Sequence, residues 1–431
     1  MTFFLAFRNL VRLRRRYTLV ALAVLVGFSL VFVVSGTALG ALEAMRAKAA
    51  RYFAGDVSVQ GFPDNDRTHQ RIKDAEAMCR ELLGAGIGVR SATPRNIYYG
   101  EDATLIFGGE VVRQRRLVGI DFDKEASAFA GLACIEGSIE GMTGTGGREG
   151  ILISEAAAKI LGAHLGDDIT ITLSTDTGQY NSGTLVVRGI FRETSLFGYL
   201  AYMQLDALND LTRRPRGSAT DIAIYGRPGE DTGALAERVR LFLGRSYHVL
   251  PKMAVKADVD AALYGIKEQS YAVLPLEGNL TQMRDIVQAF LAITWVAVGI
   301  FIAIVMVGIL NTFRVIAYER TREIGTMRAI GMQRRSVLAL FVIEALLMAL
   351  MACIGGVIVG YAGFGILGFL DLGRIPVAGL FTERGRLGFF VDPATVFLDF
   401  CIMLGATVAA AFGPARRAAL ADPAEALRTE G

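Results

Sequence analysis

The chain has 431 residues, of which 52% are hydrophobic and only 20% are charged, and its mean hydropathy is +0.41. This composition excludes a disordered or fibrous protein and argues against a wholly soluble one. The net charge of +3 is too small to indicate a nucleic-acid-binding protein.

The N-terminal segment 1–16 is basic, with five arginines and no acidic residue. Its apolar residues recur at helical spacing, which predicts a cytoplasmic amphipathic helix that lies on the inner surface of a membrane. A plain basic tail is the alternative. The apolar stripe consists of Phe3, Phe4, Phe7, Leu10 and Val11.

The segment 17–42 contains no charged residue, and a bilayer crossing needs about 20 apolar residues. A cleaved signal peptide is the alternative, because arginines precede the run and small residues end it. The apolar core of a signal peptide is only about 7–15 residues long, however. We therefore predict a retained transmembrane helix over 17–42.

The long segment 43–285 has the alternating apolar pattern of a folded α+β domain. Apolar residues at helical spacing continue past the first span to Phe53 and begin again at Leu280. Both flanks are therefore predicted to be amphipathic stalks that prolong the neighbouring spans, with short flanking helices as the alternative. Cys79 and Cys134 form either one disulfide or two buried thiols.

Patterns typical of catalysis and metal binding are absent from the sequence. No G-x-x-x-x-G-K-[ST] phosphate loop occurs, and the glycine-rich stretch 141–147 lacks the lysine that such a loop needs. The histidines at 69, 164 and 248 are far apart and have no cysteine or second histidine nearby, so no zinc site is expected. We expect no catalytic residues, no cofactor and no metal in this chain.

Three further apolar segments follow, at 286–313, 337–370 and 393–412, and each is long enough to cross a bilayer. The loop 314–336 is rich in arginine, whereas the loop 371–392 is balanced in charge. The positive-inside rule therefore places 314–336, the N-terminus and the tail 413–431 in the cytoplasm. The domain 43–285 and the loop 371–392 then lie outside.

Small residues at four-residue spacing mark positions where helices can approach closely. They would serve packing within the chain or against a second copy. Glu344 lies about 10 Å into the third span, close enough to Arg334 or Arg335 to pair, so a structural or coupling role is favoured over a proton path. Asp399 is expected to reach the outer interface. The small residues are Gly36, Gly40, Gly356, Gly360 and Gly405, the last followed by Ala409 and Gly413.

The arginine-rich loop contains a short helical pattern that a simple basic loop does not explain. Ile324, Met327 and Ile330 lie three residues apart, so a helix over 321–330 would carry one apolar edge between arginines. Gly331 is a natural helix stop.

The run E-R-T-R-E-I-G-T-M-R-A-I-G at 319–331 resembles the loop that opens the C-terminal permease module of MacB/FtsX-type ABC transporters, which include the lipoprotein-releasing permeases. The likeness continues through Glu344, the glycines at 355, 356 and 360, and the tail motifs at 414–418 and 422–427. Weaker likeness is present at 8–10, 151–173 and 189–191.

This resemblance implies a membrane protein with four transmembrane helices in a one-plus-three layout and a large α+β extracytoplasmic domain, the MacB-like core domain. The segment 286–428 would be the FtsX-like permease module. The helix in the loop would dock on the ATPase as a coupling helix. The residues implied in ATPase coupling are Arg322, Glu323, Ile324, Met327, Arg328, Ile330 and Gly331.

The resemblance further implies a permease subunit in a bacterial inner membrane that moves its outer domain when a separate cytoplasmic ATPase dimer, which uses ATP and Mg²⁺, hydrolyses ATP. A second permease copy, identical or homologous, would complete it. Lipoprotein release or export of another hydrophobic cargo, with a periplasmic carrier as a further partner, is the expected role. The alternative is an FtsX-like receptor or scaffold that signals to a partner such as a cell-wall hydrolase.

Overall fold

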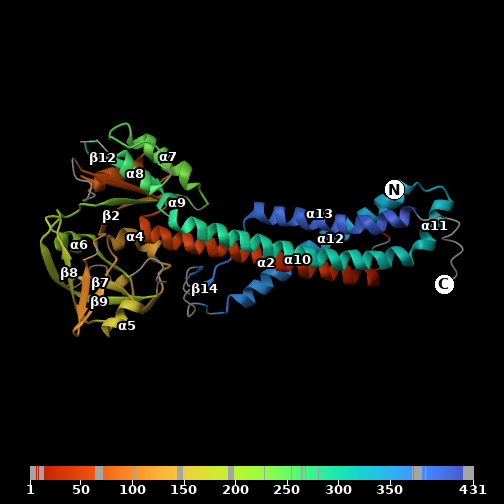
Figure 1. Ribbon diagram of the computed structural model, residues 1–431, viewed down its shortest axis with the longest axis horizontal. Helices are drawn as coiled ribbons and strands as arrows, with labels where there is room; N and C mark the ends of the chain where they lie inside the picture. Colours follow the sequence, from red (N-terminus) through yellow and green to blue (C-terminus); the bar gives the residue numbers. More distant parts are fainter. Residues whose placement is uncertain are drawn as a thin grey trace. The chain divides into compact units, whose positions relative to one another are not determined.

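The computed structural model describes residues 6, 8, 14–63, 71–98, 100, 102–142, 149–192, 199–227, 229–253, 255–263, 266, 268–279, 281–370, 372, 381–383 and 385–420. The chain divides into two compact units (Figure 1). The helical unit comprises Met1–Glu43, Val287–Asp371 and Leu387–Gly431, and the sheet unit comprises Ala44–Ile286 and Leu372–Arg386. Most of the predicted N-terminal helix and the tail beyond Leu420 lie outside the described residues.

Long apolar helices make up the helical unit. Four helices of the described chain are long and apolar enough to cross a membrane, one near the N-terminus and three toward the C-terminus, which confirms the one-plus-three layout. The first two contribute residues to both units. The helices are α2 (Arg14–Phe53), α10 (Thr281–Glu319), α11 (Thr321–Ala329), α12 (Arg334–Leu367) and α13 (Pro393–Leu420).

The core of the helical unit is built from aromatic and small apolar side chains. Phe28 and Phe32 of α2, Phe313 of α10 and Phe341 of α12 are almost fully buried in it. Helices α12 and α13 pack closely against each other. In its most apolar stretch α12 is 50% buried and α10 only 11%, so α10 leaves most of its apolar surface outside the packing of the single chain.

The sheet unit holds a mixed, largely antiparallel 12-stranded sheet in the order β12-β1-β11-β2-β5-β10-β7-β9-β8-β3-β4, with β6 paired to β9. The parallel pairs are β5 with β10 and β7 with β9. The strands are β1 (Val57–Phe62), β2 (Ser91–Tyr98), β3 (Thr104–Phe107), β4 (Glu110–Arg113), β5 (Arg116–Ile120), β6 (Cys134–Gly137), β7 (Gly150–Ser154), β8 (Asp168–Ser174), β9 (Tyr180–Phe191), β10 (Leu200–Gln204), β11 (Asp221–Tyr225) and β12 (Ser270–Pro275).

Short helices connect these strands and cover the sheet, which confirms the α+β class. A separate two-stranded pair is formed by β13 and β14. The helices are α3 (Ala75–Gly84), α4 (Phe122–Phe129), the 3-10 turn η1 (Glu140–Met142), α5 (Glu155–Leu161), α6 (Leu205–Thr212), α7 (Thr232–Leu243), α8 (Lys256–Ala262) and α9 (Leu276–Asn279), and the pair is β13 (Thr382–Glu383) and β14 (Arg386–Leu387).

Local sequence explains how α5 begins and ends. The Ser154 hydroxyl accepts a hydrogen bond from the backbone N–H of Ala157 at 3.3 Å and so caps the first turn. Gly162 ends the helix with a φ of 65°, a left-handed conformation that favours glycine.

All four cysteines are free, so the disulfide alternative for Cys79 and Cys134 is wrong. Cys79 is buried, and Cys134 is half-buried. Burial raises the pKa of the Cys79 thiol to about 12, which keeps it protonated at neutral pH.

Candidate functional site

Helix α11 occupies the predicted place in the arginine-rich loop. It spans Thr321–Ala329, and the backbone N–H of Ile330 still donates to the Thr326 carbonyl at 3.1 Å. Gly331 follows with a φ of 99°, so the expected helix stop adopts a conformation that favours glycine.

The predicted apolar edge of α11 divides between two environments. Ile324 is 1% exposed and belongs to the core of the helical unit, and Met327 packs against that core. Ile330, by contrast, is 88% exposed. The outward surface of the loop helix, which we call the α11 face, consists of the exposed residues Arg322, Glu323, Thr326, Ala329 and Ile330.

A buried polar cluster lies where α10 meets α11. Arg320 Nη1 donates to Glu344 Oε2 at 2.8 Å and to Tyr17 Oη at 3.2 Å. The Tyr17 hydroxyl in turn donates to Glu344 Oε2 at 2.6 Å. Arg320 Nε donates to Glu323 Oε2 at 3.1 Å, and the guanidinium lies 5.2 Å from the ring centroid of Phe341.

This cluster corrects the expected pairing of Glu344. The arginine that binds it is Arg320, whereas Arg334 and Arg335 are exposed. Arg320 and Glu344 are 2% exposed or less, and the loss of one partner from such a pair leaves an uncompensated buried charge. Through Tyr17 on α2, Arg320 at the start of α11 and Glu344 on α12, the cluster ties the loop helix to two long helices.

Four of the five predicted packing glycines lie at close contacts, Gly36 and Gly40 against the non-helical segment 388–389 and Gly356 and Gly360 against α2. An alanine Cβ at Gly36 would be 2.1 Å from the Phe389 ring, and one at Gly40 would be 2.1 Å from the Gly388 carbonyl oxygen. A Cβ at Gly356 would lie 3.0 Å from Phe28, and one at Gly360 would lie 2.6 Å from Phe32. At the exposed Gly405 an added Cβ would meet no described atom of this chain within 4 Å.

Asp399 on α13 is buried within the helical unit. Its side chain is 2% exposed and does not reach solvent. It lines a cavity of about 10 Å³ together with Ser35 and Thr395.

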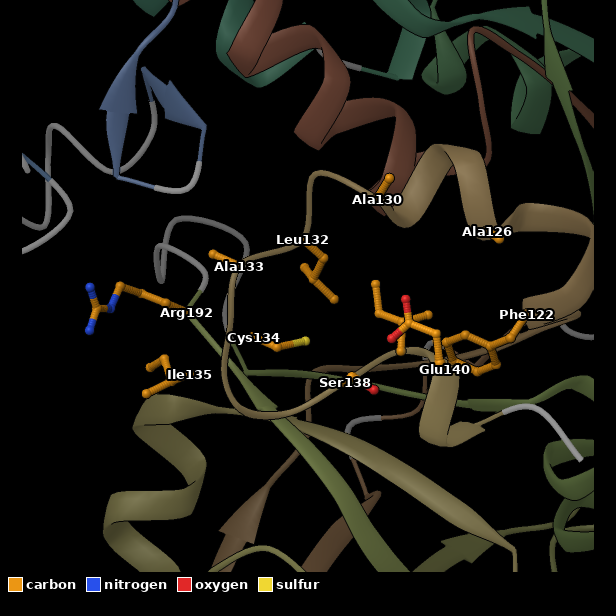
Figure 2. Close-up of a pocket in the computed structure, with 11 residues that line it drawn as sticks. Phe122, Ala126, Ala130, Leu132, Ala133, Cys134, Ile135, Ser138, Glu140 and Arg192 are labelled. Carbon is orange, nitrogen blue, oxygen red and sulfur yellow. The ribbon is translucent and has the colours of Figure 1, made fainter. Parts of the chain in front are cut away.

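The sheet unit contains a larger cavity of about 620 Å³, which the sequence did not reveal. Most of its lining side chains are apolar, but polar and apolar atoms contribute nearly equal shares of its surface, and the wall comes from α4, β6 and the segments beside them. Figure 2 shows Leu132 and Cys134 directed toward the cavity, while Arg192 extends away from it. The lining residues are Phe122, Ala126, Ala130, Leu132, Ala133, Cys134, Ile135, Ser138, Ile139, Glu140 and Arg192.

Comparison with known protein families assigns both units. Residues 17–241 match the MacB-like periplasmic core domain, and residues 295–423 match the FtsX-like permease C-terminal domain. The first match covers more than half of the chain.

Individual relatives align over shorter stretches. The macrolide export ATP-binding/permease protein MacB of Bordetella avium is 36% identical over 140 residues, which are 32% of this chain and 19% of that protein. The ABC transporter permease YtrF of Bacillus subtilis is 31% identical over 134 residues, which are 30% of each chain. The chain thus spans less than a third of the length of these two relatives.

A solved structure gives a weaker likeness. The periplasmic region of MacB from Actinobacillus actinomycetemcomitans aligns with 55% of this chain and 95% of that chain at 15% identity. The TM-score is 0.32, which is too low to support an argument about the fold.

Proposed function

Because the chain belongs to the MacB/FtsX-type family of ABC transporter permeases, we propose that it is the membrane subunit of a transporter whose ATP is hydrolysed by a separate cytoplasmic ABC ATPase. The chain sits in a bacterial inner membrane with both termini in the cytoplasm, and a second permease copy, identical or homologous, completes the assembly.

The observation that carries this proposal is the construction of α11. Ile324 anchors the helix in the core, while Ile330 is 88% exposed and Arg322 and Glu323 are exposed near the other end of the helix. An anchored helix with an exposed large apolar side chain at its end is suited to insertion into a groove of a partner protein. The proposed partner at the α11 face is the ATPase.

Movement of α11 would pass first through the buried polar cluster. Arg320 immediately precedes α11, and its guanidinium binds Glu344 of α12 and Tyr17 of α2. Helix α2 continues without interruption from Arg14 to Phe53, so the helix held at Tyr17 also supplies residues to the sheet unit. ATP-driven displacement of the loop helix would thereby act on the extracytoplasmic domain.

The proposed cargo is a lipoprotein or another hydrophobic molecule. Apolar side chains among those that line the 620 Å³ cavity of the sheet unit, such as Phe122, Leu132 and Ile139, would contact a hydrophobic cargo. One relative is named as a macrolide export protein, so an apolar small molecule is the other hydrophobic cargo that we propose.

Replacement of Ile330 tests the ATPase contact. Tagged full-length chain is purified from its native membranes, and the co-purifying ABC ATPase is quantified by mass spectrometry. Ile330→Asp should reduce ATPase recovery at least about tenfold, because a charged carboxylate would have to lose its water in the partner's groove.

The matched control is Tyr180→Asp, since Tyr180 is a 78% exposed side chain of the sheet unit. This control should retain the recovery of the parent chain. Equal recovery with Ile330→Asp, or absence of an ATPase from the parent preparation, would contradict the proposal.

A further inference from the structure

The last turn of α2 is held inside the sheet unit by a fully buried arginine of β2. Arg95 is 0% exposed, and its Nη1 donates to the backbone carbonyl of Arg51 at 2.7 Å and to that of Ala50 at 3.4 Å. These carbonyls belong to the last turn of the helix, whose C=O groups have no partners within the helix. The guanidinium therefore binds the backbone of α2 at the end of the helix.

The same guanidinium holds α4. Arg95 Nε donates to Glu125 Oε1 at 2.9 Å, and Nη2 donates to the second carboxylate oxygen of Glu125. Nη2 also donates to Tyr225 Oη at 2.7 Å, and the Thr93 hydroxyl donates to Glu125 Oε1 at 2.9 Å. One side chain thus connects α2, β2 and α4.

Two further contacts fix the same turn of α2. Arg51 Nη1 donates to the Ala128 carbonyl of α4 at 3.5 Å. The guanidinium of Arg116, at the start of β5, lies 4.2 Å from the ring centroid of Tyr52 and 5.1 Å from that of Phe53. The end of α2 and the body of α4 are consequently bonded to each other and to neighbouring strands.

Helix α4 forms one wall of the 620 Å³ cavity. Phe122, Ala126 and Ala130 line it, and Figure 2 shows these residues along the side opposite Ile135. Glu125 lies between them in the sequence but is 2% exposed and directed to Arg95. Helix α4 therefore contacts the cavity on one face and Arg95, which binds the end of α2, on another.

A buried ion pair is a costly way to end a helix. Apolar residues of similar volume often stabilise a fold equally well or better. The α2 terminus already has a backbone bond from the Gly55 N–H to the Ala50 carbonyl at 2.7 Å. The Arg95–Glu125 ion pair adds a link between α2 and α4 that helix termination alone does not require.

We infer that Arg95 is a positioning residue that makes the last turn of α2 and helix α4 move together, so that displacement of α2 changes the width of the cavity behind α4. This inference rests on the proposed function, because the ATPase supplies the displacement. Arg95 acts through Glu125 and the α2 carbonyls and need not touch the cargo.

The distance between α4 and β6 measures cavity width. Ser127 and Ile135 are exposed, so Ser127→Cys and Ile135→Cys carry spin labels in the full-length complex with its ATPase, in lipid nanodiscs. Cys134 and Cys401 are replaced by serine, whereas Cys79 and Cys353 are buried and remain. Pulsed electron resonance then compares the nucleotide-free complex with the complex trapped by ATP, Mg²⁺ and vanadate.

We expect the distance distribution of the parent complex to shift on trapping. The paired variant Arg95→Met with Glu125→Leu removes both charges together and should lose this shift. Arg95→Lys should reduce it, because one ammonium group cannot hold the Glu125 carboxylate and the α2 carbonyls at the same time. If thermal unfolding shows that the paired variant does not fold, the shift measured in Arg95→Lys decides whether the inference holds.

The control is another arginine–carboxylate pair of the sheet unit, Arg214 with Asp176. Arg214 binds Asp176 at 2.8 Å and Asn96 at 2.7 Å, and neither partner belongs to α2 or α4. Arg214→Met with Asp176→Leu should keep the parental shift.

A parental shift in the paired Arg95 variant or in Arg95→Lys would overturn the inference. Absence of any shift in a parent complex that contains its ATPase would overturn it too and leave the proposed function intact. Absence of the ATPase itself would instead refute the proposed function.

Discussion

Single buried polar residues of the sheet unit show how strongly burial affects charge. Asp221 begins β11 and is 0% exposed, and Oδ2 accepts a hydrogen bond from the Thr220 hydroxyl at 2.7 Å. Burial still raises the pKa of this carboxyl above its usual range, because desolvation disfavours the charged form. Asp221 is therefore expected to cost stability whenever it is ionised.

The substitution Asp221→Asn tests this cost. A carboxyl whose pKa is raised in the folded state stabilises the fold while it is protonated, and this contribution is lost as the pH rises through the folded-state pKa. At pH 7 the asparagine variant should be more stable by about 1–3 kcal/mol. Below the ordinary aspartate pKa of 3.8 the two chains should converge.

Thermal unfolding of the full-length chain in detergent at both pH values makes the comparison. Glu110→Gln is the control, since Glu110 is exposed on β4 and should not change the unfolding temperature. A lower unfolding temperature for Asp221→Asn at pH 7 would contradict the argument.

Gly40 of α2 provides a second test at the scale of one residue. In a helix, alanine is normally more stable than glycine by roughly 0.5–1 kcal/mol. At Gly40 the added Cβ would meet the Gly388 carbonyl oxygen at 2.1 Å, and backbone cannot rotate away as a side chain can. Gly40→Ala should therefore destabilise the helical unit by about 1–3 kcal/mol.

Gly405→Ala is the matched control, because its Cβ meets no described atom within 4 Å. Thermal unfolding in detergent should show a loss for Gly40→Ala and no loss for Gly405→Ala. The close approach of α2 to the segment at Gly388 would be disproved if both variants unfolded at or above the parental temperature.

At the scale of elements, the connection between α11 and the long helices depends on the Arg320–Glu344 pair. Glu344→Gln should destabilise the chain by about 3 kcal/mol, because it leaves the Arg320 guanidinium without its buried counter-charge, and the remaining partner Glu323 is 60% exposed. Glu323→Gln removes a 60% exposed partner of the same arginine and should cost less than about 1 kcal/mol.

The double substitution Arg320→Met with Glu344→Leu separates stability from coupling. It should recover most of the stability lost in Glu344→Gln, because no buried charge remains. ATP hydrolysis by the complex should nevertheless lose its response to cargo, since α11 is no longer bonded to α2 and α12. Normal coupling in the double variant would show that the cluster serves stability alone.

The elements differ in how well sequence predicts them. The four spans and the one-plus-three layout followed from uncharged runs, because hydropathy is a local property, and α11 was expected over 321–330 and spans Thr321–Ala329. The prediction for the partner of Glu344 was wrong. The arginine that binds it, Arg320, is 24 residues away in sequence, whereas Arg334 is nearer. The cavity behind α4 was missed because its lining extends from Phe122 to Arg192 and carries no motif.

At the scale of the whole molecule, the proposed function requires an ATPase as partner. The chain belongs to a permease family, and its α11 face ends in an exposed isoleucine. The buried cluster at Arg320 and the hydrogen bonds of Arg95 both hold α2, one in each unit. Both sets of contacts would transmit a movement of α2 that the partner ATPase drives.

Purification of the tagged parent chain from its native membranes into lipid nanodiscs tests this claim most directly. Mass spectrometry and ATP hydrolysis are measured on the same preparation. We expect an ABC ATPase in a fixed ratio to this chain, with hydrolysis that vanadate inhibits and that disappears when the ATPase is removed. A chain that purifies without an ATPase, or with a cell-wall hydrolase in its place, would contradict it.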